Sequence, residues 1–294
     1  MQFDLTKCRV CPRKCSADRT RGLGACGADS KIRIAKIMLH RWEEPCISGT
    51  DEKRGSGAVF FGGCPLKCVF CQNKAISRST AEMKAYTPKE LSLEFRHLEE
   101  MGAYNINLVS PTQYIPQIKE ALSLYRPTVP VIFNTGGYEL REAVEALRGY
   151  ADIFLTDFKY GTNEAGKKYS AVSDYTTVAK EALSAMVSVV GEPRFSEDGM
   201  LLSGVIVRHL ILPGERRDSI KALSEVANTV PSNSVILSLM RQYTPDFAPD
   251  MIPSLKRRIT TFEYDTVCAE AISLGFSGYS QDADSAKSQY TPDF

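Results

Sequence analysis

The stretch VFFGGCPLKCVFCQN, residues Val59 to Asn73, is the most informative part of the chain. An apolar run of strand type leads through two glycines into three cysteines spaced C-x3-C-x2-C, at Cys64, Cys68 and Cys71. This spacing lets a tight loop direct successive sulfurs toward one polynuclear iron centre. Three thiolates leave one iron of a four-iron cluster without a protein ligand, and an open coordination position is typical of reactive metal centres. The spacing alone also admits a zinc knuckle or a set of buried free thiols.

The composition indicates an ordinary globular protein with a sizeable core. The chain has 294 residues, 43% of them hydrophobic and 24% charged, a length that fits two average domains or one α/β barrel. We find no apolar run near the roughly 20 residues needed to cross a bilayer and no signal-peptide core at the start, so we expect a cytoplasmic protein. Lysine and arginine number 36 against 35 acidic residues, which gives no support for nucleic-acid or membrane binding.

The nine cysteines favour metal ligation or reduced thiols over disulfides, because the chain shows no secretion signal. A second group with the spacing C-x2-C-x3-C-x10-C lies near the N-terminus, at Cys8, Cys11, Cys15 and Cys26. Four thiolates can close a tetrahedral site that fixes a segment too short for its own core. Zinc and iron-sulfur centres both accept four thiolates, so the metal stays open, and free cysteines in a tail are the alternative. We expect Cys46 and Cys268 to be buried free thiols.

From Gly57 onward, short apolar runs alternate with segments of helical period, which is typical of strand-helix units around a parallel sheet. The predicted strands are residues 58–62, 104–109, 129–134, 152–157, 205–211 and 235–240. The predicted helices are residues 88–101, 113–125, 139–149, 174–190, 216–229 and 261–274, several with proline at the start or glycine past the end. Alternating apolar residues over 32–37 predict a strand or an extended arm before the first unit.

The cysteine loop, with the aromatic Phe70 directly before its third cysteine, resembles the cluster-binding loop of the radical S-adenosylmethionine (SAM) superfamily. The loop and the flanking segments HRWEEPCISGT and LVSPTQY resemble the branch related to pyruvate formate-lyase activating enzyme. This resemblance covers most of the chain. The resemblance implies an α/β fold, a partial (βα)6 TIM-type barrel with a small N-terminal cysteine-rich metal-binding module. We expect this module and an extended arm over residues 1–49, the barrel over 50–280 and a tail over 281–294.

The resemblance also implies a site at the C-terminal ends of the strands, where barrels of this kind carry their chemistry. Cys64, Cys68 and Cys71 would ligate a 4Fe-4S cluster. SAM would be held by Phe70 and by polar residues at the later strand ends, namely Ser110, Thr112, Asn134, Asp157, Lys159 and Arg208. In related enzymes an acidic turn receives the methionine amino group where this chain has Ser110 and Thr112, so hydroxyls or backbone carbonyls must substitute for it.

Several of these residues have a structural alternative. Asp157 and Lys159 are two apart on a strand and share a face, so they can reach one cavity or form only a salt bridge at the barrel rim. His209 faces away from Arg208 and is expected to be a core histidine. Glu43 and Glu44 could orient a substrate or the cluster loop, although the sequence favours a surface pair.

The activity implied by the resemblance is reductive cleavage of SAM to methionine and a 5'-deoxyadenosyl radical that abstracts hydrogen from a substrate, an oxidoreductase-class reaction. The cofactors supply this chemistry, so no side chain need act as a general acid or base. The leading substrate is a glycyl-radical enzyme, with flavodoxin or ferredoxin as electron donor. The alternatives are radical modification of another protein, peptide or small molecule, and a non-catalytic iron-sulfur or metal-binding protein.

The hexapeptide QYTPDF occurs twice, at residues 242–247 and 289–294. We hypothesise that the second copy, in the tail, docks near the mouth of the barrel or on the equivalent surface of a partner.

Overall fold

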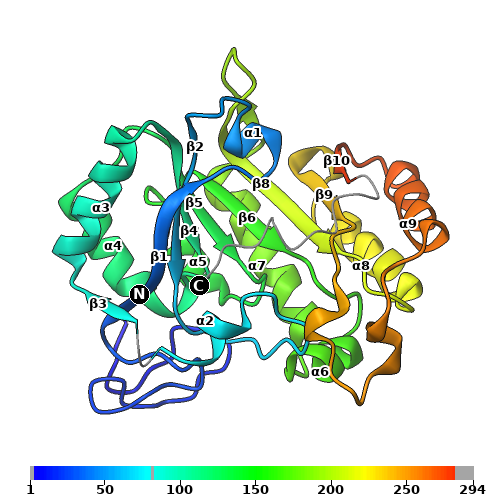
Figure 1. Ribbon diagram of the computed structural model, residues 1–294, viewed down its shortest axis with the longest axis horizontal. Helices are drawn as coiled ribbons and strands as arrows, with labels where there is room; N and C mark the ends of the chain where they lie inside the picture. The colour runs from blue at the N-terminus through cyan, green and yellow to red at the C-terminus, as the bar shows by residue number, and fades with distance from the viewer. Residues whose placement is uncertain (1–2, 81–82, 282–294) are drawn as a thin grey trace.

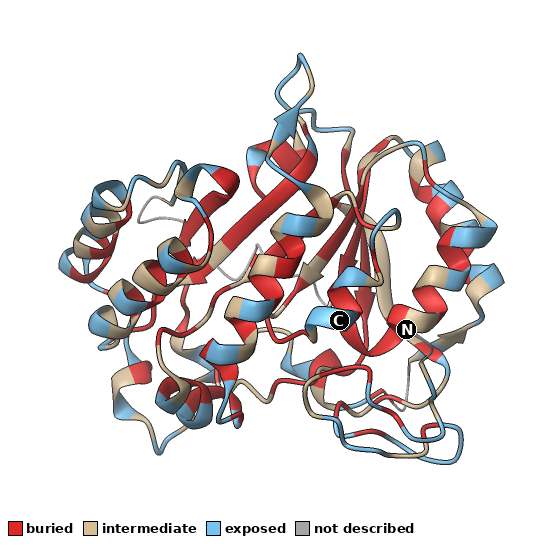
Figure 2. Ribbon diagram, turned by 180° about the vertical axis from the view of Figure 1, so that it is seen from behind, coloured by how far each residue is buried: buried red, intermediate tan, exposed pale blue. Residues whose placement is uncertain are grey.

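The computed structural model describes residues 3–80 and 83–281, which form a curved sheet with helices packed on its outer face (Figure 1). Six strands run parallel to one another in the order predicted from the sequence. They are β2 (Gly55–Phe61), β4 (Ala103–Val109), β5 (Val131–Thr135), β6 (Ile153–Asp157), β8 (Leu201–Leu210) and β9 (Ile236–Met240). The strands are largely buried, whereas the helices are exposed on their outer sides (Figure 2). This confirms the predicted α/β fold built from six strand-helix units.

Most of the helices also follow the prediction. The described helices are α1 (Pro45–Ser48), α2 (Lys74–Arg78), α3 (Pro88–Glu100), α4 (Ile115–Leu124), α5 (Arg141–Glu145), α6 (Asn163–Ser170), α7 (Tyr175–Val190), α8 (Arg216–Thr229) and α9 (Thr261–Ser273). The short helices α1 and α2 were not predicted. The predicted helix over 139–149 is wrong in length, because the backbone is still extended at Leu140 and turns at Gly149 with a φ of 80°. Helix α6 was not predicted, since its lysines and glycine give little apolar periodicity over only eight residues.

Further strands extend the sheet at both edges. Strand β1 (Ile32–His40) runs antiparallel to β2, and β3 (Lys84–Tyr86) pairs with the start of β1. At the other edge, β10 (Gly278–Ser280) runs parallel to β9. The two-residue strand β7 (Arg194–Phe195) pairs with β8. Among the described strands β10 and β1 do not pair, so the barrel is open on that side, as a partial barrel requires.

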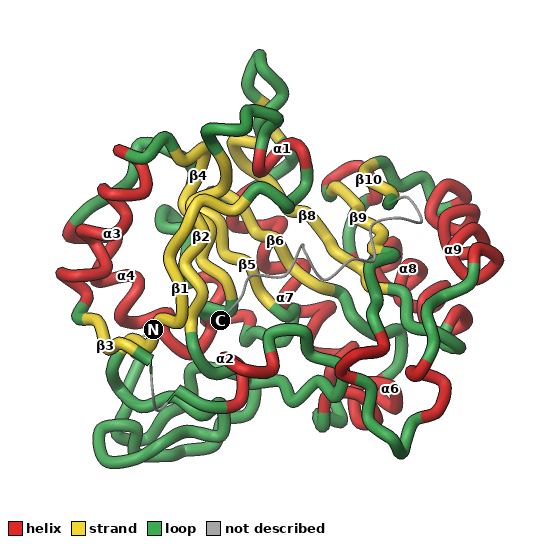
Figure 3. The backbone as a smooth tube through the Cα atoms, in the orientation of Figure 1, coloured by secondary structure: helices red, strands yellow, loops and turns green. Residues whose placement is uncertain are grey.

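Residues 3–31 hold no helix or strand and pack against the loop that follows β2 (Figure 3). The Cys64 amide donates to the Cys26 carbonyl at 2.9 Å, and Arg13 Nε donates to the Pro65 carbonyl at 2.8 Å. Arg19 is 1% exposed and its guanidinium donates to the Gln113 carbonyl at 2.6 Å. The N-terminal segment is therefore fixed directly onto the cysteine loop.

Two sequence-based expectations concern the ends of the chain and the membrane. The second QYTPDF copy lies outside the described residues, while the first forms the connection after β9 and includes a short 3-10 turn at Pro245–Phe247. None of the described helices combines the length and the apolar character needed to span a bilayer.

Candidate functional site

A cavity of about 420 Å³ lies inside the barrel, between the cysteine loop and the ends of the parallel strands. Nine of the ten residues predicted to bind the cluster or SAM line it, namely Cys64, Cys68, Phe70, Cys71, Ser110, Asn134, Asp157, Lys159 and Arg208. His40 and Trp42 from the β1 side and Tyr279 and Gln281 from the β10 side also line it, so the cavity reaches the open side of the sheet. A second hollow, of about 660 Å³, lies along β1, and none of the predicted site residues lines it.

The cysteine loop is held by contacts that sequence reasoning did not find. Gln113 is 1% exposed, and its Nε2 donates to the carbonyls of Gly62 and Gly63, each at 3.0 Å. On the other side, the amides of Lys67 and Val69 donate to backbone carbonyls at the end of α6, at 3.1 and 2.9 Å. The only sequence signal for Gln113 is its place directly after the predicted second strand.

Burial makes two of the loop thiols, those of Cys64 and Cys68, poor acids in the absence of a cation. It raises the pKa of the Cys64 thiol to about 12, and the neighbouring Cys68 thiol adds to this effect. The pKa of Cys68 is raised for the same reason, although the ammonium of Lys159 partly offsets it. A metal centre supplies the positive charge that converts such thiols to thiolates.

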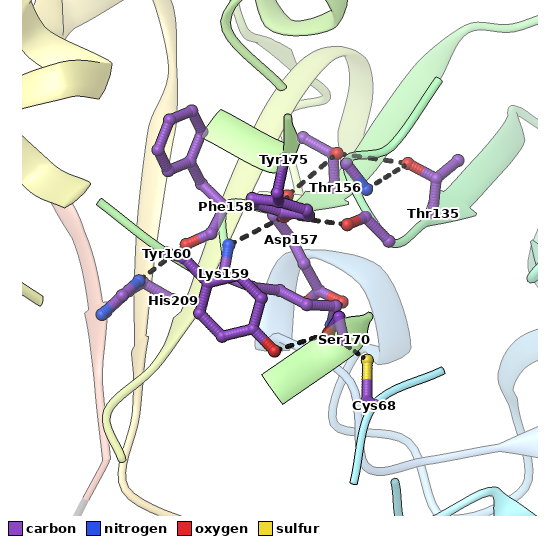
Figure 4. A network of polar contacts seen from close by, with 12 residues as sticks. Cys68, Thr135, Thr156, Asp157, Phe158, Lys159, Tyr160, Ser170, Tyr175 and His209 are labelled. Carbon is purple, nitrogen blue, oxygen red and sulfur yellow. Dashed lines mark hydrogen bonds and ion pairs between the residues drawn. The ribbon is translucent and has the colours of Figure 1, made fainter. Parts of the chain in front are cut away.

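Asp157, the last residue of β6, forms an ion pair with Lys159, two residues beyond it (Figure 4). Both residues line the cavity. Burial opposes the charge of Lys159, but the Asp157 carboxylate and the Cys68 sulfur more than offset it, so the pKa of the ammonium is raised. The Lys159 amide donates to the Tyr175 hydroxyl at 2.9 Å, and this hydroxyl donates to the Gly136 carbonyl, also at 2.9 Å. The ion pair expected as a structural alternative is present, and it lies in the cavity.

Ser110 and Asn134 lie on the same wall of the cavity, at the ends of β4 and β5. The Ser110 amide donates to the Asn134 carbonyl at 2.9 Å. Ser110 has a φ of 58°, a left-handed conformation that costs a residue with a side chain and concentrates at functional positions. Two neighbouring strand ends therefore present polar side chains to one space.

Thr112 does not line the cavity. It is 2% exposed and its hydroxyl donates to Glu139 at 2.9 Å. Burial raises the pKa of the Glu139 carboxyl to about 7, and the Thr112 hydroxyl only partly counters this. Sequence reasoning missed Glu139, because a single glutamate near a helix start carries no signal of burial.

A buried ion-pair cluster forms the wall of the cavity between β8 and the segment after β1. Arg208 contacts Glu44 through two hydrogen bonds of 2.8 and 2.6 Å, and it also pairs with Glu43. The side chains of Arg208, Glu43 and Glu44 are 13%, 8% and 6% exposed. The expectation of a surface pair at Glu43 and Glu44 is therefore wrong, because both carboxylates pair with Arg208 and line the cavity next to Pro45, the first residue of α1 (Pro45–Ser48).

Other residues named from the sequence lie outside the cavity. His209 points away from it and its Nδ1 lies 2.7 Å from the Phe158 carbonyl oxygen (Figure 4), which confirms the expected core histidine. Cys46 is 3% exposed, as expected of a buried thiol, whereas Cys268 is only partly buried. In the N-terminal group Cys8, Cys11 and Cys26 are buried, and Cys15 is exposed.

Gly137, just beyond β5, lies where the ends of two neighbouring strands are closely packed. Its φ is 76°, and a Cβ built there would lie 2.0 Å from the Asp157 carbonyl oxygen. Gly149 has a similar φ of 80°, but no atom lies within 4 Å of its Cβ position. Substitution of Gly149 therefore measures the cost of the left-handed backbone conformation without a steric clash. We expect Gly149→Ala to lower the free energy of unfolding by about 1–2 kcal/mol. Gly137→Ala should lower it by a further ~1–3 kcal/mol from overpacking. Urea unfolding measures both, and equal losses would contradict this packing.

Comparison with known proteins places the chain in a family. A sequence profile described as "Radical SAM superfamily" matches residues 58–227, more than half of the chain. The chain belongs to the radical SAM superfamily. A curated relative, "Uncharacterized protein MJ0674" of Methanocaldococcus jannaschii, is 28% identical over 268 residues, which cover 88% of this chain and 72% of that protein.

Two solved structures are similar to this radical SAM protein at low identity. Methylornithine synthase (PylB) matches with a TM-score of 0.44 and 13% identity, over 72% of this chain and 58% of that one. Streptococcus suis SuiB matches with a TM-score of 0.47 and 10% identity, over 77% of this chain and 49% of that one. The chain thus spans less than two thirds of the length of either solved protein.

Membership of the radical SAM superfamily supports radical SAM chemistry, and with it an enzyme that uses a 4Fe-4S cluster and SAM. The residues present fit the cluster, since three soft thiol donors border a cavity that also holds a lysine and an asparagine. Within the described residues, no three histidine, cysteine, aspartate or glutamate side chains converge to bind a single metal ion. A polynuclear cluster places its thiolates on different iron atoms, so its cysteines need not converge in that way.

Proposed function

We propose that this radical SAM protein reductively cleaves SAM and uses the resulting radical to activate a glycyl-radical enzyme. The observation that carries the proposal is the cavity, which sets Cys64, Cys68 and Cys71 against the Asp157–Lys159 pair and extends to the open side of the barrel. The similarity of the cysteine loop to activating enzymes supports the choice of substrate. An opening between β1 and β10 suits a substrate that is presented as a segment of another protein chain.

When bound, the cluster supplies the electron that cleaves SAM to methionine and a 5'-deoxyadenosyl radical. In this proposal the chain's own residues bind and orient SAM. The ammonium of Lys159 is the group for the methionine carboxylate, because a compact charge binds a carboxylate without demanding a planar fork. Asp157, Asn134 and Ser110 supply hydrogen-bond partners for the amino group and the nucleoside.

Aromatic side chains around the loop keep water away from the cluster region. Phe70 is 8% exposed and packs edge-on against Tyr169 and Tyr243, at centroid distances of 6.3 and 6.2 Å. Excluding water protects a reactive radical from side reactions. Arg208 closes the opposite wall together with its two glutamates, and we propose that it borders bound SAM from there.

The remaining parts of the proposal concern the N-terminal module and the partners. We propose that Cys8, Cys11, Cys15 and Cys26 hold a second metal centre, zinc or iron-sulfur, within residues 1–49. No three of these thiols converge on a single ion in the described residues, so binding of zinc would require them to draw together. Burial raises the pKa of Cys11 to about 12, so its thiol also needs a cation to ionise. We further propose a cytoplasmic location, where thiols stay reduced, and a flavodoxin or ferredoxin as the electron donor.

The glycyl-radical assignment predicts hydrogen transfer from a backbone glycine. The protein, reconstituted without oxygen, is mixed with dithionite, SAM and a glycyl-radical enzyme from the same organism whose glycines carry deuterium at Cα. We expect deuterium in 5'-deoxyadenosine and a glycyl radical signal in electron paramagnetic resonance, because the radical abstracts that hydrogen.

The matched control is the same partner enzyme with its reactive glycine replaced by alanine, which should give neither result. Formation of 5'-deoxyadenosine without deuterium would instead point to another protein, a peptide or a small molecule as the substrate.

A further inference from the structure

A chain of two hydroxyl groups ends on the sulfur of Cys68 (Figure 4). Ser170, the last residue of α6, places its Oγ 2.9 Å from the Cys68 Sγ. The Tyr160 hydroxyl lies 2.6 Å from the same Ser170 oxygen. Ser170 and Tyr160 are 0% and 1% exposed, so water does not compete for these contacts. No local pattern in the sequence connects either residue with the loop, because Ser170 lies 102 positions after Cys68 and Tyr160 ten positions before Ser170.

Ligation of iron by Cys68 determines the direction of these hydrogen bonds. A thiolate bound to iron carries no proton, so it can only accept a hydrogen bond. The Ser170 hydroxyl must then donate to the sulfur. Its oxygen in turn accepts from Tyr160, and hydrogen bonds linked in this way strengthen one another.

The backbone holds Ser170 in place independently of its hydroxyl. The amides of Lys67 and Val69, on either side of Cys68, donate to the carbonyls of Ser170 and Tyr169 at 3.1 and 2.9 Å. Removing the Ser170 hydroxyl therefore leaves the loop attached to α6 at two points.

The aromatic rings around Tyr160 likewise fix its hydroxyl. The ring of Tyr160 stacks on that of Tyr169, with an interplanar angle of 25°, and meets the Tyr175 ring edge-on at a centroid distance of 5.0 Å. Both donors are thus set by packing that does not depend on the sulfur.

We infer that Ser170 and Tyr160 are positioning residues that raise the reduction potential of the cluster bound through Cys68. Hydrogen bonds to the cysteine sulfurs are among the determinants of iron-sulfur potentials. Reduction adds negative charge that is shared by these sulfurs, so a donor stabilises the reduced state more than the oxidised state. The inference concerns the cluster and goes beyond the proposed substrate.

Redox titration of the reconstituted protein tests this inference without SAM or a substrate. The reduced cluster is detected by electron paramagnetic resonance, and iron is quantified in each variant. We expect Ser170→Ala to lower the equilibrium constant for one-electron reduction about tenfold, a shift of about 59 mV to more negative potential. Tyr160→Phe should shift the potential in the same direction but less, and Ser170→Thr, which keeps the hydroxyl, should restore the wild-type value.

Ser77 offers a matched control, because its Oγ lies farther from a loop sulfur, 3.5 Å from the Cys71 Sγ. Ser77→Ala should shift the potential less than Ser170→Ala does. An unchanged potential in Ser170→Ala at full iron content would overturn the inference. If Ser170→Ala loses the cluster, Tyr160→Phe decides, and an unchanged potential there would overturn it. Because no glycyl-radical partner takes part, failure of the deuterium-transfer experiment leaves this result intact, and the reverse also holds.

Discussion

The Cys64→Ala variant is expected to form no 5'-deoxyadenosine above background when it is reconstituted and supplied with dithionite and SAM. Cys64 lines the cavity together with Cys68 and Cys71, and only these three cysteines do so within the described residues. Two thiolates cannot hold a four-iron cluster in the place of three, so electron delivery to SAM should stop. Product is measured by chromatography, and iron and sulfide content are measured in parallel. Both should fall.

Two cysteine variants serve as controls. Cys268 lies on α9, outside the cavity and only partly buried, so Cys268→Ala should retain both cluster and product. Cys11→Ala should lower the metal content of the N-terminal module and leave the loop cysteines unchanged. Product formation at the wild-type rate in Cys64→Ala would exclude this residue as a ligand. Absence of product in the wild type with an intact cluster would favour a non-catalytic iron-sulfur protein.

Arg208→Met is expected to give the largest loss of stability among substitutions in the cavity wall. The substitution leaves Glu43 and Glu44 buried without their common partner. Removing one member of a buried ion pair typically costs about 3–5 kcal/mol, because the remaining charge is desolvated and unpaired. Urea unfolding at neutral pH measures the loss.

The triple variant Arg208→Met, Glu43→Gln, Glu44→Gln should recover much of the lost stability, because no unpaired charge remains. A loss below ~1 kcal/mol in Arg208→Met would show that the carboxylates find other compensation.

The loss in Arg208→Met should also depend on pH. Burial acts to raise the pKa of Glu44, but the charge and hydrogen bonds of Arg208 outweigh it and hold the pKa below its ordinary value of 4.5. In the wild type this carboxylate therefore stabilises the fold above about pH 4.5 and loses that contribution as the pH falls. Without Arg208, only the hydrogen bonds of Ser238 and of the Glu44 backbone oppose the effect of burial, so the carboxyl takes up a proton more readily. The difference in stability between wild type and variant should shrink as the pH falls from neutral toward 4.5.

Much of the fold could be predicted because strands and helices leave local patterns. All six barrel strands and the bounds of α8 were visible in apolar runs, prolines and glycines, since parallel strands buried on both faces must be apolar. Helix α3 is capped by Thr87, the residue before it, whose hydroxyl accepts from the Glu90 amide in a pattern that is visible in the sequence. Helix α6 escaped prediction, although it supplies the Ser170 hydroxyl next to Cys68.

The candidate site likewise combines features that follow from local sequence patterns with features that do not. The sequence by itself determined the cysteine loop and its place after the first strand, because three thiolates spaced for one cluster are a local feature. It also indicated Asn134, Asp157 and Lys159, because they resemble motifs of the activating enzymes and stand near the ends of parallel strands, which meet at one edge. Only the tertiary structure decided which charges are buried and which hydroxyls reach a sulfur. Glu44 meets Arg208 across 164 positions, and Cys68 meets Ser170 across 102. Such contacts depend on how distant segments pack, and no local pattern of residues records them.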